Sequence, residues 1–296
     1  MGRALAETSA AARDVFRRVD EALGEPLSKL CFEGPIEELT LTRNTQPALV
    51  ATSCAIVAAI REAHPTLPAP ILAMGHSLGE YAALVASGTL ALEDAVRVCR
   101  ARGEAMQAAV PAGTGGMAAI VALSDEIVAA VCEEARAKGP VEPANYNAPG
   151  QIVIAGAKEA VAEACRLADA RGGKAIALNV SAPFHSSLMR PAAERVSLEL
   201  ANVKLGPLSF PVIANVDGEP NTDPERVRGL LVRQVDAPVQ WVRSSRKAAL
   251  LGVTIALEIG PGKVLAGLQK RIDKAIKVVS VNDAAQIAGL STLLGA

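Results

Sequence analysis

The sequence has neither the aromatic content nor the excess of positive charge on which nucleic-acid binding depends. Aromatic residues make up 2% of its 296 residues, and the formal net charge is -1. A chain with so few stacking side chains and no excess of positive charge does not suit nucleic acid, so we expect no such partner. Histidine is also scarce, with three residues in the chain. Any choice of a catalytic base among the histidines is therefore narrow.

Cysteines are few, odd in number and scattered. They are Cys31, Cys54, Cys99, Cys132 and Cys165. No C-x-x-C pair occurs, so the pattern indicates neither a disulfide framework nor a zinc site, and we expect no metal. Buried, reduced thiols of this kind are typical of a cytoplasmic protein.

Long apolar runs are missing as well. The longest, residues 49–60, is interrupted by Thr52 and Ser53 and is too short to span a bilayer. The first residues carry charges of both signs, unlike the basic start of a secretory signal. We therefore expect no membrane partner and a cytoplasmic location.

The most informative stretch that is present centres on a serine. An apolar segment at 71–74 leads into G-H-S-L-G at 75–79, and a helical pattern follows over 80–87. This order of strand, sharp turn and helix is the form of a nucleophile elbow with Ser77 at its apex. The flanking glycines permit the tight turn, and the N–H of Leu78 would face a developing oxyanion. The alternative is an ordinary turn in which Ser77 only caps the helix.

Strand and helix patterns alternate along the chain, which predicts an α/β fold with a doubly wound, mostly parallel sheet. Residues 113–180 follow a Gly/Pro-rich break and read β-α-β-β-α-β, the order of a ferredoxin-like unit. We expect a large domain, formed by 1–112 and 181–296, into which this small subdomain is inserted. The alternative is that its strands extend the main sheet.

The N-terminal third is predicted to be mainly helical. Apolar residues at helical spacing favour one amphipathic helix over 3–22. A polar connector is expected at 33–46, and a mostly apolar, buried helix over 46–64.

A nucleophilic serine needs a general base, and the histidines are the candidates. His76 adjoins Ser77, so its ring should diverge from the serine around the tight turn. His64 precedes Pro65 at a helix end and is better explained as a cap or surface group. His185 lies in an irregular loop between a strand and a helix, where open α/β sheets carry catalytic groups. We predict that His185 is the base, with an ordinary loop histidine as the alternative.

A third group should orient the imidazole ring. No Asp or Glu between Ser77 and His185 stands out in a strand-end loop, which weakens a Ser-His-Asp interpretation. An amide or a backbone carbonyl could orient the ring instead, because orientation needs an acceptor and not a charge. Arg102, on the helix after the elbow helix, would bind a substrate carboxylate if it faced the serine. Arginines on helices are more often at the surface.

Several motifs together resemble those of the malonyl-CoA:acyl-carrier-protein transacylases of fatty acid and polyketide synthesis. They are GHSLGEY at 75–81, RG at 102–103, NYNAPGQ at 145–151, PFH at 183–185, PVQW at 238–241 and EIGPGKVL at 258–265. The resemblance covers nearly the whole chain. It implies a hydrolase-like large domain with an inserted ferredoxin-like subdomain, and transfer of a malonyl group from coenzyme A to acyl carrier protein.

The resemblance also implies roles for single residues. Ser77 would hold the malonyl group as an ester, and His185 would take and return the proton. Gln240 would offer an acceptor to the His185 ring. Arg102 would pair with the malonyl carboxylate, and the Leu78 N–H would form half of the oxyanion hole.

Further residues of these motifs are assigned to substrate binding. Phe184, which precedes the catalytic histidine, is similar to the residue of malonyl-selecting members, and His76 and Asn147 lie in the matching motifs. The resemblance implies no cofactor beyond the coenzyme A thioester. It implies acyl carrier protein and malonyl-CoA as partners. We also expect a monomer.

One departure from the family pattern concerns the start of the sequence. Members of the family begin with an apolar strand and a G-Q-G-S-Q loop, whose first glutamine supplies the other oxyanion N–H. This sequence starts just after that point, so either it is a truncation or has a mis-assigned start, or it has lost a central strand and half of the oxyanion hole. We expect it to be poorly active or less stable than a version that carries the segment. Losing one oxyanion donor costs about a hundred- to thousandfold in rate. The alternatives to a transacylase are a serine thioesterase or esterase on the same fold, or a truncated, weakly active module that binds a carrier protein.

Overall fold

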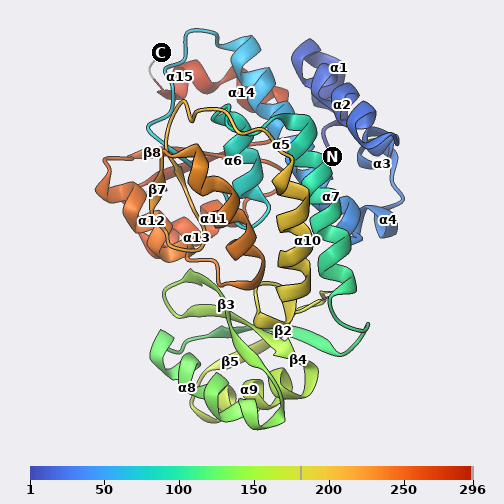
Figure 1. The fold of residues 1–296 in the computed structure, drawn as a ribbon. Coiled ribbons are helices and arrows are strands. Elements are labelled where there is room, and N and C mark those ends of the chain that lie inside the picture. The colour runs from blue at the N-terminus through green and yellow to red at the C-terminus, as the bar shows by residue number, and fades with distance from the viewer. Residues whose placement is uncertain (181, 295–296) are drawn as a thin grey trace.

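The computed structural model describes residues 1–180 and 182–294 (Figure 1). Figure 1 shows a larger helix-rich part and a smaller part below it, in which a sheet separates two helices from the rest of the molecule. The domain bounds stay a prediction, since Ser181, the expected return point of the chain, lies outside the described residues.

The N-terminal region is helical, as predicted, but it is divided more finely. Its helices are α1 (Arg3–Thr8), α2 (Ala10–Leu23), α3 (Leu27–Glu33), α4 (Ile36–Thr40) and α5 (Thr42–Ala63). The single helix predicted over 3–22 is wrong, because Ser9 is extended and its hydroxyl caps α2 by accepting the Ala12 N–H at 3.0 Å. The polar connector is also wrong, because α4 and the first turn of α5 occupy most of it.

The core of the larger part is formed by helices that pack around α5. α2, α6 (Gly79–Ala86) and α7 (Leu92–Ala108) pack on α5 itself, α10 (Arg190–Ala201) packs on α7, and α11 (Pro224–Asp236) and η2 (Ser187–Met189) pack on α10. Val50, Ala51 and Ile56 of α5 are fully buried in this cluster. Apolar residues spaced three to four positions apart lie on one face of a helix, and this face is buried.

The strands of the larger part are short and mostly parallel. They are β1 (Ala73–Met74), β6 (Val212–Ile213), β7 (Pro220–Asn221), β8 (Ile255–Ile259) and β9 (Lys277–Val281). The remaining helices of the larger part are α12 (Trp241–Leu250), α13 (Val264–Ile272), α14 (Ala284–Ala288) and α15 (Leu290–Leu294). β1 pairs with β6 and β8 with β9 in parallel, whereas β7 is antiparallel to β6. The α/β class is therefore confirmed. Within the described chain, hydrogen bonds join these strands as two separate groups.

The smaller part has its own antiparallel sheet. Its elements are β2 (Gly115–Val121), α8 (Asp125–Ala135), η1 (Arg136–Lys138), β3 (Val141–Ala148), β4 (Gln151–Ala157), α9 (Lys158–Ala170) and β5 (Lys174–Ala177). The strand order β3-β4-β2-β5 is that of a ferredoxin-like unit, so these strands do not extend the main sheet. α8 and α9 cover one face, and the other faces the larger part, where Phe184 packs against it (Figure 1).

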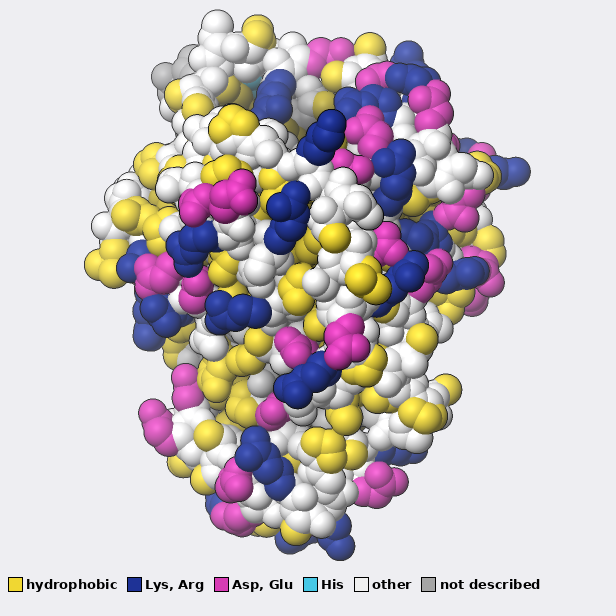
Figure 2. Space-filling view, viewed as in Figure 1, with side chains coloured by type: hydrophobic (Ala, Val, Ile, Leu, Met, Phe, Trp, Pro, Cys, Tyr) yellow, Lys and Arg dark blue, Asp and Glu magenta, His cyan; other side chains and the backbone are white. Residues whose placement is uncertain are grey.

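The surface carries charges of both signs. Figure 2 shows basic and acidic side chains interspersed over the visible face, in keeping with the net charge of -1. Among the described helices, none combines the length and the apolar character that crossing a membrane requires.

Candidate active site

The backbone around Ser77 has the strained geometry of a nucleophile elbow. Ser77 follows β1 closely with φ of 52°, a left-handed value that is rare for a residue other than glycine. α6 then begins at Gly79. A Cβ on Gly75 would lie 2.0 Å from the carbonyl of Gly79, so only glycine fits where strand and helix meet. The turn predicted from G-H-S-L-G is therefore present.

Asn215 holds this turn from the neighbouring strand. It follows β6, and its Oδ1 accepts the Ser77 N–H at 2.6 Å while its Nδ2 donates to the Gly75 carbonyl at 2.7 Å. The Ser77 N–H is thus occupied. The Leu78 N–H at the start of α6 has no hydrogen bond within the described residues, so it remains available to an oxyanion, as the motif predicts.

Ser77 and His185 are in hydrogen-bond contact. The Ser77 Oγ lies 2.8 Å from His185 Nε2, and His185 Nδ1 lies 2.8 Å from the main-chain carbonyl of Gln234. Because a carbonyl only accepts, Nδ1 carries the hydrogen and Nε2 is left to accept the serine proton. Burial and the nearby Arg102 lower the pKa of His185 to about 3, so the ring is neutral at pH 7 and can act as a base.

The prediction that Gln240 orients the His185 ring is wrong. Gln240 lies just before α12, and its N–H donates to the Asn215 carbonyl at 2.8 Å. The acceptor for the ring is Gln234, which lies in the last turn of α11. Carbonyls in a last helical turn have no partner within the helix, so this one is free to accept from the imidazole. The more general expectation, an amide or backbone carbonyl in place of an acid, is confirmed.

Arg102 faces the serine, as predicted. It projects from α7 with 1% of its surface exposed, and its Nη2 donates to the Ser77 Oγ at 3.1 Å and to Gln234 Oε1 at 2.9 Å. Its Nη1 donates to Gln46 Oε1 at 2.6 Å, and its Nε has no hydrogen-bond partner among the described residues. Arg102 forms no ion pair with a carboxylate in the part of the chain that the structure describes. A buried cation held only by neutral oxygens is suited to an incoming anion.

The other predicted substrate residues lie toward the smaller part. His76 Nε2 is 2.8 Å from Asn147 Oδ1 on β3, and its ring centroid is 5.4 Å from that of Trp241. Its ring therefore diverges from Ser77, as expected, and burial lowers its pKa. Phe184 packs between the core of the larger part and the sheet of the smaller one.

Sequence reasoning missed four polar residues of this site. They are Gln46, Glu80, Asn215 and Gln234. Gln46 and Glu80 carried a usable signal, since each is a polar residue in the first turn of a predicted helix. Among the described residues, no cluster of histidine, cysteine, aspartate and glutamate is arranged to hold a metal ion.

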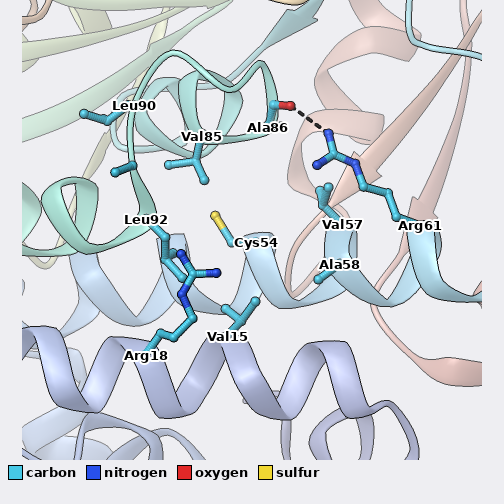
Figure 3. A pocket seen from close by; sticks show the side chains of 11 residues that line it. Val15, Arg18, Cys54, Val57, Ala58, Arg61, Val85, Ala86, Leu90 and Leu92 are labelled. Carbon is cyan, nitrogen blue, oxygen red and sulfur yellow. Dashed lines mark hydrogen bonds between the residues drawn. The ribbon is translucent and has the colours of Figure 1, made fainter. Parts of the chain in front are cut away.

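A separate cavity of about 290 Å³ lies between α2, α5 and the segment that links α6 to α7 (Figure 3). Most of its lining residues are apolar, and Cys54 lies between the side chains of Arg18 and Arg61. Both arginines have partners, since Arg18 pairs with Glu93 and Arg61 donates to the Ala86 carbonyl. None of the predicted site residues lines this cavity, so it is distinct from the serine site.

The fold and the site define the class: an α/β enzyme of acyl transfer whose site brings together a serine, a histidine and a buried arginine. The model of the acyl transferase domain family matches residues 1–291. The chain belongs to this family.

Individual relatives agree with this assignment. The chain is 44% identical over 282 residues to the malonyl CoA-acyl carrier protein transacylase of Haemophilus influenzae. The aligned region covers 95% of this chain and 90% of the relative. The acyl-carrier-protein-S-malonyltransferase of Bartonella henselae superposes with a TM-score of 0.96 at 45% identity, covering 100% of this chain and 95% of that one. A malonyl-transacylase solved in complex with a type II polyketide synthase acyl carrier protein has a TM-score of 0.95 and 41% identity, with coverage of 100% and 95%.

Proposed function

We propose that this chain transfers the malonyl group from malonyl-CoA to the phosphopantetheine thiol of acyl carrier protein, through a malonyl ester on Ser77, and so supplies fatty acid synthesis. The observation that carries the proposal is the guanidinium of Arg102, which is buried, has no carboxylate partner among the described residues, and lies 3.1 Å from Ser77 Oγ. A malonyl group differs from an acetyl group by one carboxylate. Arg102 is the group that would recognise this carboxylate.

In the first half-reaction, Ser77 Oγ attacks the thioester carbonyl carbon while its proton passes to His185 Nε2. The negative charge on the carbonyl oxygen is stabilised by the Leu78 N–H. The C–S bond then breaks, coenzyme A takes the proton from His185 as it leaves, and the malonyl group remains as an ester. The carbonyl of Gln234 keeps the imidazole in the tautomer that this step needs.

In the second half-reaction, the carrier-protein thiol gives its proton to His185 and attacks the ester carbonyl. The ester C–O bond breaks, and Ser77 Oγ recovers the proton. Serine and histidine supply all the chemistry, so we propose that no cofactor takes part beyond the thioester itself. His76 and Asn147, bonded to each other across the two parts of the molecule, and Phe184 beside His185 are proposed to form the wall of the substrate site.

Intact-mass measurement tests the proposal. After mixing with malonyl-CoA, the protein should gain the mass of one malonyl group on Ser77, and holo acyl carrier protein should remove it and become malonylated. Ser77→Ala should gain nothing. Ser87→Ala is the control. It removes a fully buried serine at the C-terminal end of α6, the helix that follows Ser77, and this variant should be malonylated normally.

Other results would point to the alternative functions. An adduct that water removes faster than the carrier protein does would indicate a thioesterase. A chain that binds carrier protein but never forms the adduct would be a binding module, and the proposal would be wrong.

A further inference from the structure

Glu80 is a buried acid that the mechanism above does not use. It lies in the first turn of α6, three residues after the nucleophile, and 3% of its surface is exposed. Its Oε2 accepts the main-chain N–H of Asn215 at 3.0 Å and the side-chain Nε2 of Gln234 at 2.7 Å. No basic side chain within the described residues forms an ion pair with it. Burying a carboxylate without a cation is costly, so its contacts matter.

The Gln234 amide has one orientation that satisfies its neighbours. Both hydrogens of its Nε2 point to acceptors, one to Glu80 Oε2 and the other to the Ser77 carbonyl at 3.0 Å. Its Oε1 is therefore on the opposite side, where it accepts from Arg102 Nη2 at 2.9 Å. Turning the amide would set Oε1 against two acceptor oxygens and would set the NH2 group against a cation.

We propose that Glu80 is a positioning residue for selectivity: by holding Nε2 of Gln234, it keeps Oε1 on Arg102 and keeps the guanidinium aligned beside Ser77. This inference deepens the proposed function and rests on it. Glu80 touches no reacting atom. It acts through Gln234 on the group that would bind the malonyl carboxylate, while the main-chain carbonyl of Gln234 holds His185 independently of the amide.

Glu80→Gln tests this role at nearly constant shape. The new amide oxygen can take the place of Oε2 and accept from both Asn215 and Gln234, but a neutral oxygen holds the Gln234 Nε2 less strongly than a carboxylate does. The Gln234 amide is then held less firmly, and in the turned state its NH2 group repels Arg102. At pH 8, where the Glu80 carboxyl is ionised, replacing this charged acceptor by a neutral one should lower the rate of Ser77 acylation by malonyl-CoA about tenfold. Acylation by acetyl-CoA, which has no carboxylate, should change less than about threefold.

A double-mutant cycle shows whether the effect passes through Arg102. Acylation by malonyl-CoA is measured for the wild type, Glu80→Gln, Arg102→Ala and the double variant. If Glu80 acts through the guanidinium, Glu80→Gln has no further effect once Arg102 is absent.

Glu258 provides a matched control for loss of a buried carboxylate. Its oxygens accept the N–H groups of Leu265 and Ala266 and the hydroxyl of Ser280, with no bond to the serine site. Glu258→Gln should lower the melting temperature and leave the ratio of malonyl to acetyl acylation unchanged.

The outcomes separate the two proposals. If the wild type forms no malonyl adduct, the proposed function fails. If the wild type loads malonyl and Glu80→Gln lowers the malonyl and acetyl acylation rates equally, Glu80 is only structural and this inference is overturned. The same holds if Glu80→Gln lowers the malonyl acylation rate by the same factor with and without Arg102. Should Glu80→Gln not fold, Gln234→Met removes the same amide oxygen and keeps the carbonyl on His185. It must then lower the malonyl to acetyl ratio, and an unchanged ratio overturns the inference.

Discussion

Replacing Glu80 by glutamine should remove a loss of stability that the wild type undergoes as the pH rises from 4.5 to 7. Burial raises the pKa of the Glu80 carboxyl from its ordinary 4.5 to about 7, and the nearby Asp217 adds to the effect. In the unfolded chain the pKa returns to 4.5. Between these two pH values the native protein binds a proton that the unfolded chain has lost, so stability falls as pH rises from 4.5 to 7 and is level above that.

The size of the effect follows from the pKa values. At about 1.4 kcal/mol for each pH unit, a buried carboxyl with a pKa near 7 lowers the free energy of unfolding by ~3 kcal/mol once it is ionised. Glutamine has the same shape and does not titrate, so the variant avoids this loss. His185 also titrates, because its pKa of about 3 makes stability rise from pH 3 to its ordinary 6.5. That contribution is present in both proteins and cancels in their difference.

The assay is urea unfolding of the wild type and Glu80→Gln at pH 5, 6, 7 and 8, followed by circular dichroism. The difference in unfolding free energy should shift in favour of the variant by about 2–3 kcal/mol from pH 5 to pH 8. A difference that stays constant with pH would show that Glu80 keeps an ordinary pKa in the fold. A shift toward the wild type would show that the carboxylate is stabilised there, and either result would refute the reasoning.

Three substitutions test other parts of the site. Arg102→Ala should lower acylation by malonyl-CoA about a hundred- to thousandfold and acylation by acetyl-CoA much less, as measured by quenched-flow mass spectrometry; equal losses would contradict the carboxylate role. Gly75→Ala should cost about 3 kcal/mol in urea unfolding, because the new Cβ would lie 2.0 Å from the Gly79 carbonyl, and an unchanged midpoint would argue against the tight elbow. Asn215→Ala should slow both acylations about tenfold and alike, since the elbow around Ser77 loses both side-chain bonds; a malonyl-specific loss would place Asn215 with Arg102 instead.

Much of the site could be predicted because its signals are local. The elbow depends on residues within one turn of each other, so the glycines at 75 and 79 indicate the backbone path around Ser77. The choice of His185 followed from scarcity and from a loop between predicted elements. The β-α-β-β-α-β order of residues 113–180 likewise indicated an antiparallel sheet.

The errors arose where neighbours in space are distant in sequence. Gln240 and Gln234 lie at adjacent helix ends, and only the path of α11 over the site decides which carbonyl meets the His185 ring. The break at Ser9 was missed for the same reason, because its hydroxyl also bonds to Glu62 on α5, which no local pattern reveals.

By itself, the sequence determined the α/β class and the serine turn, because each follows from residue type and short-range geometry, and the scarcity of histidine singled out His185. The place of Arg102 beside them was implied only by the family resemblance. The tertiary structure alone decided how these groups are held. Glu80, Asn215 and Gln234 come from three separate elements, and packing brings them into one buried network around Ser77. In such a network every donor must meet an acceptor at hydrogen-bond distance, and that condition is set by the three-dimensional fold.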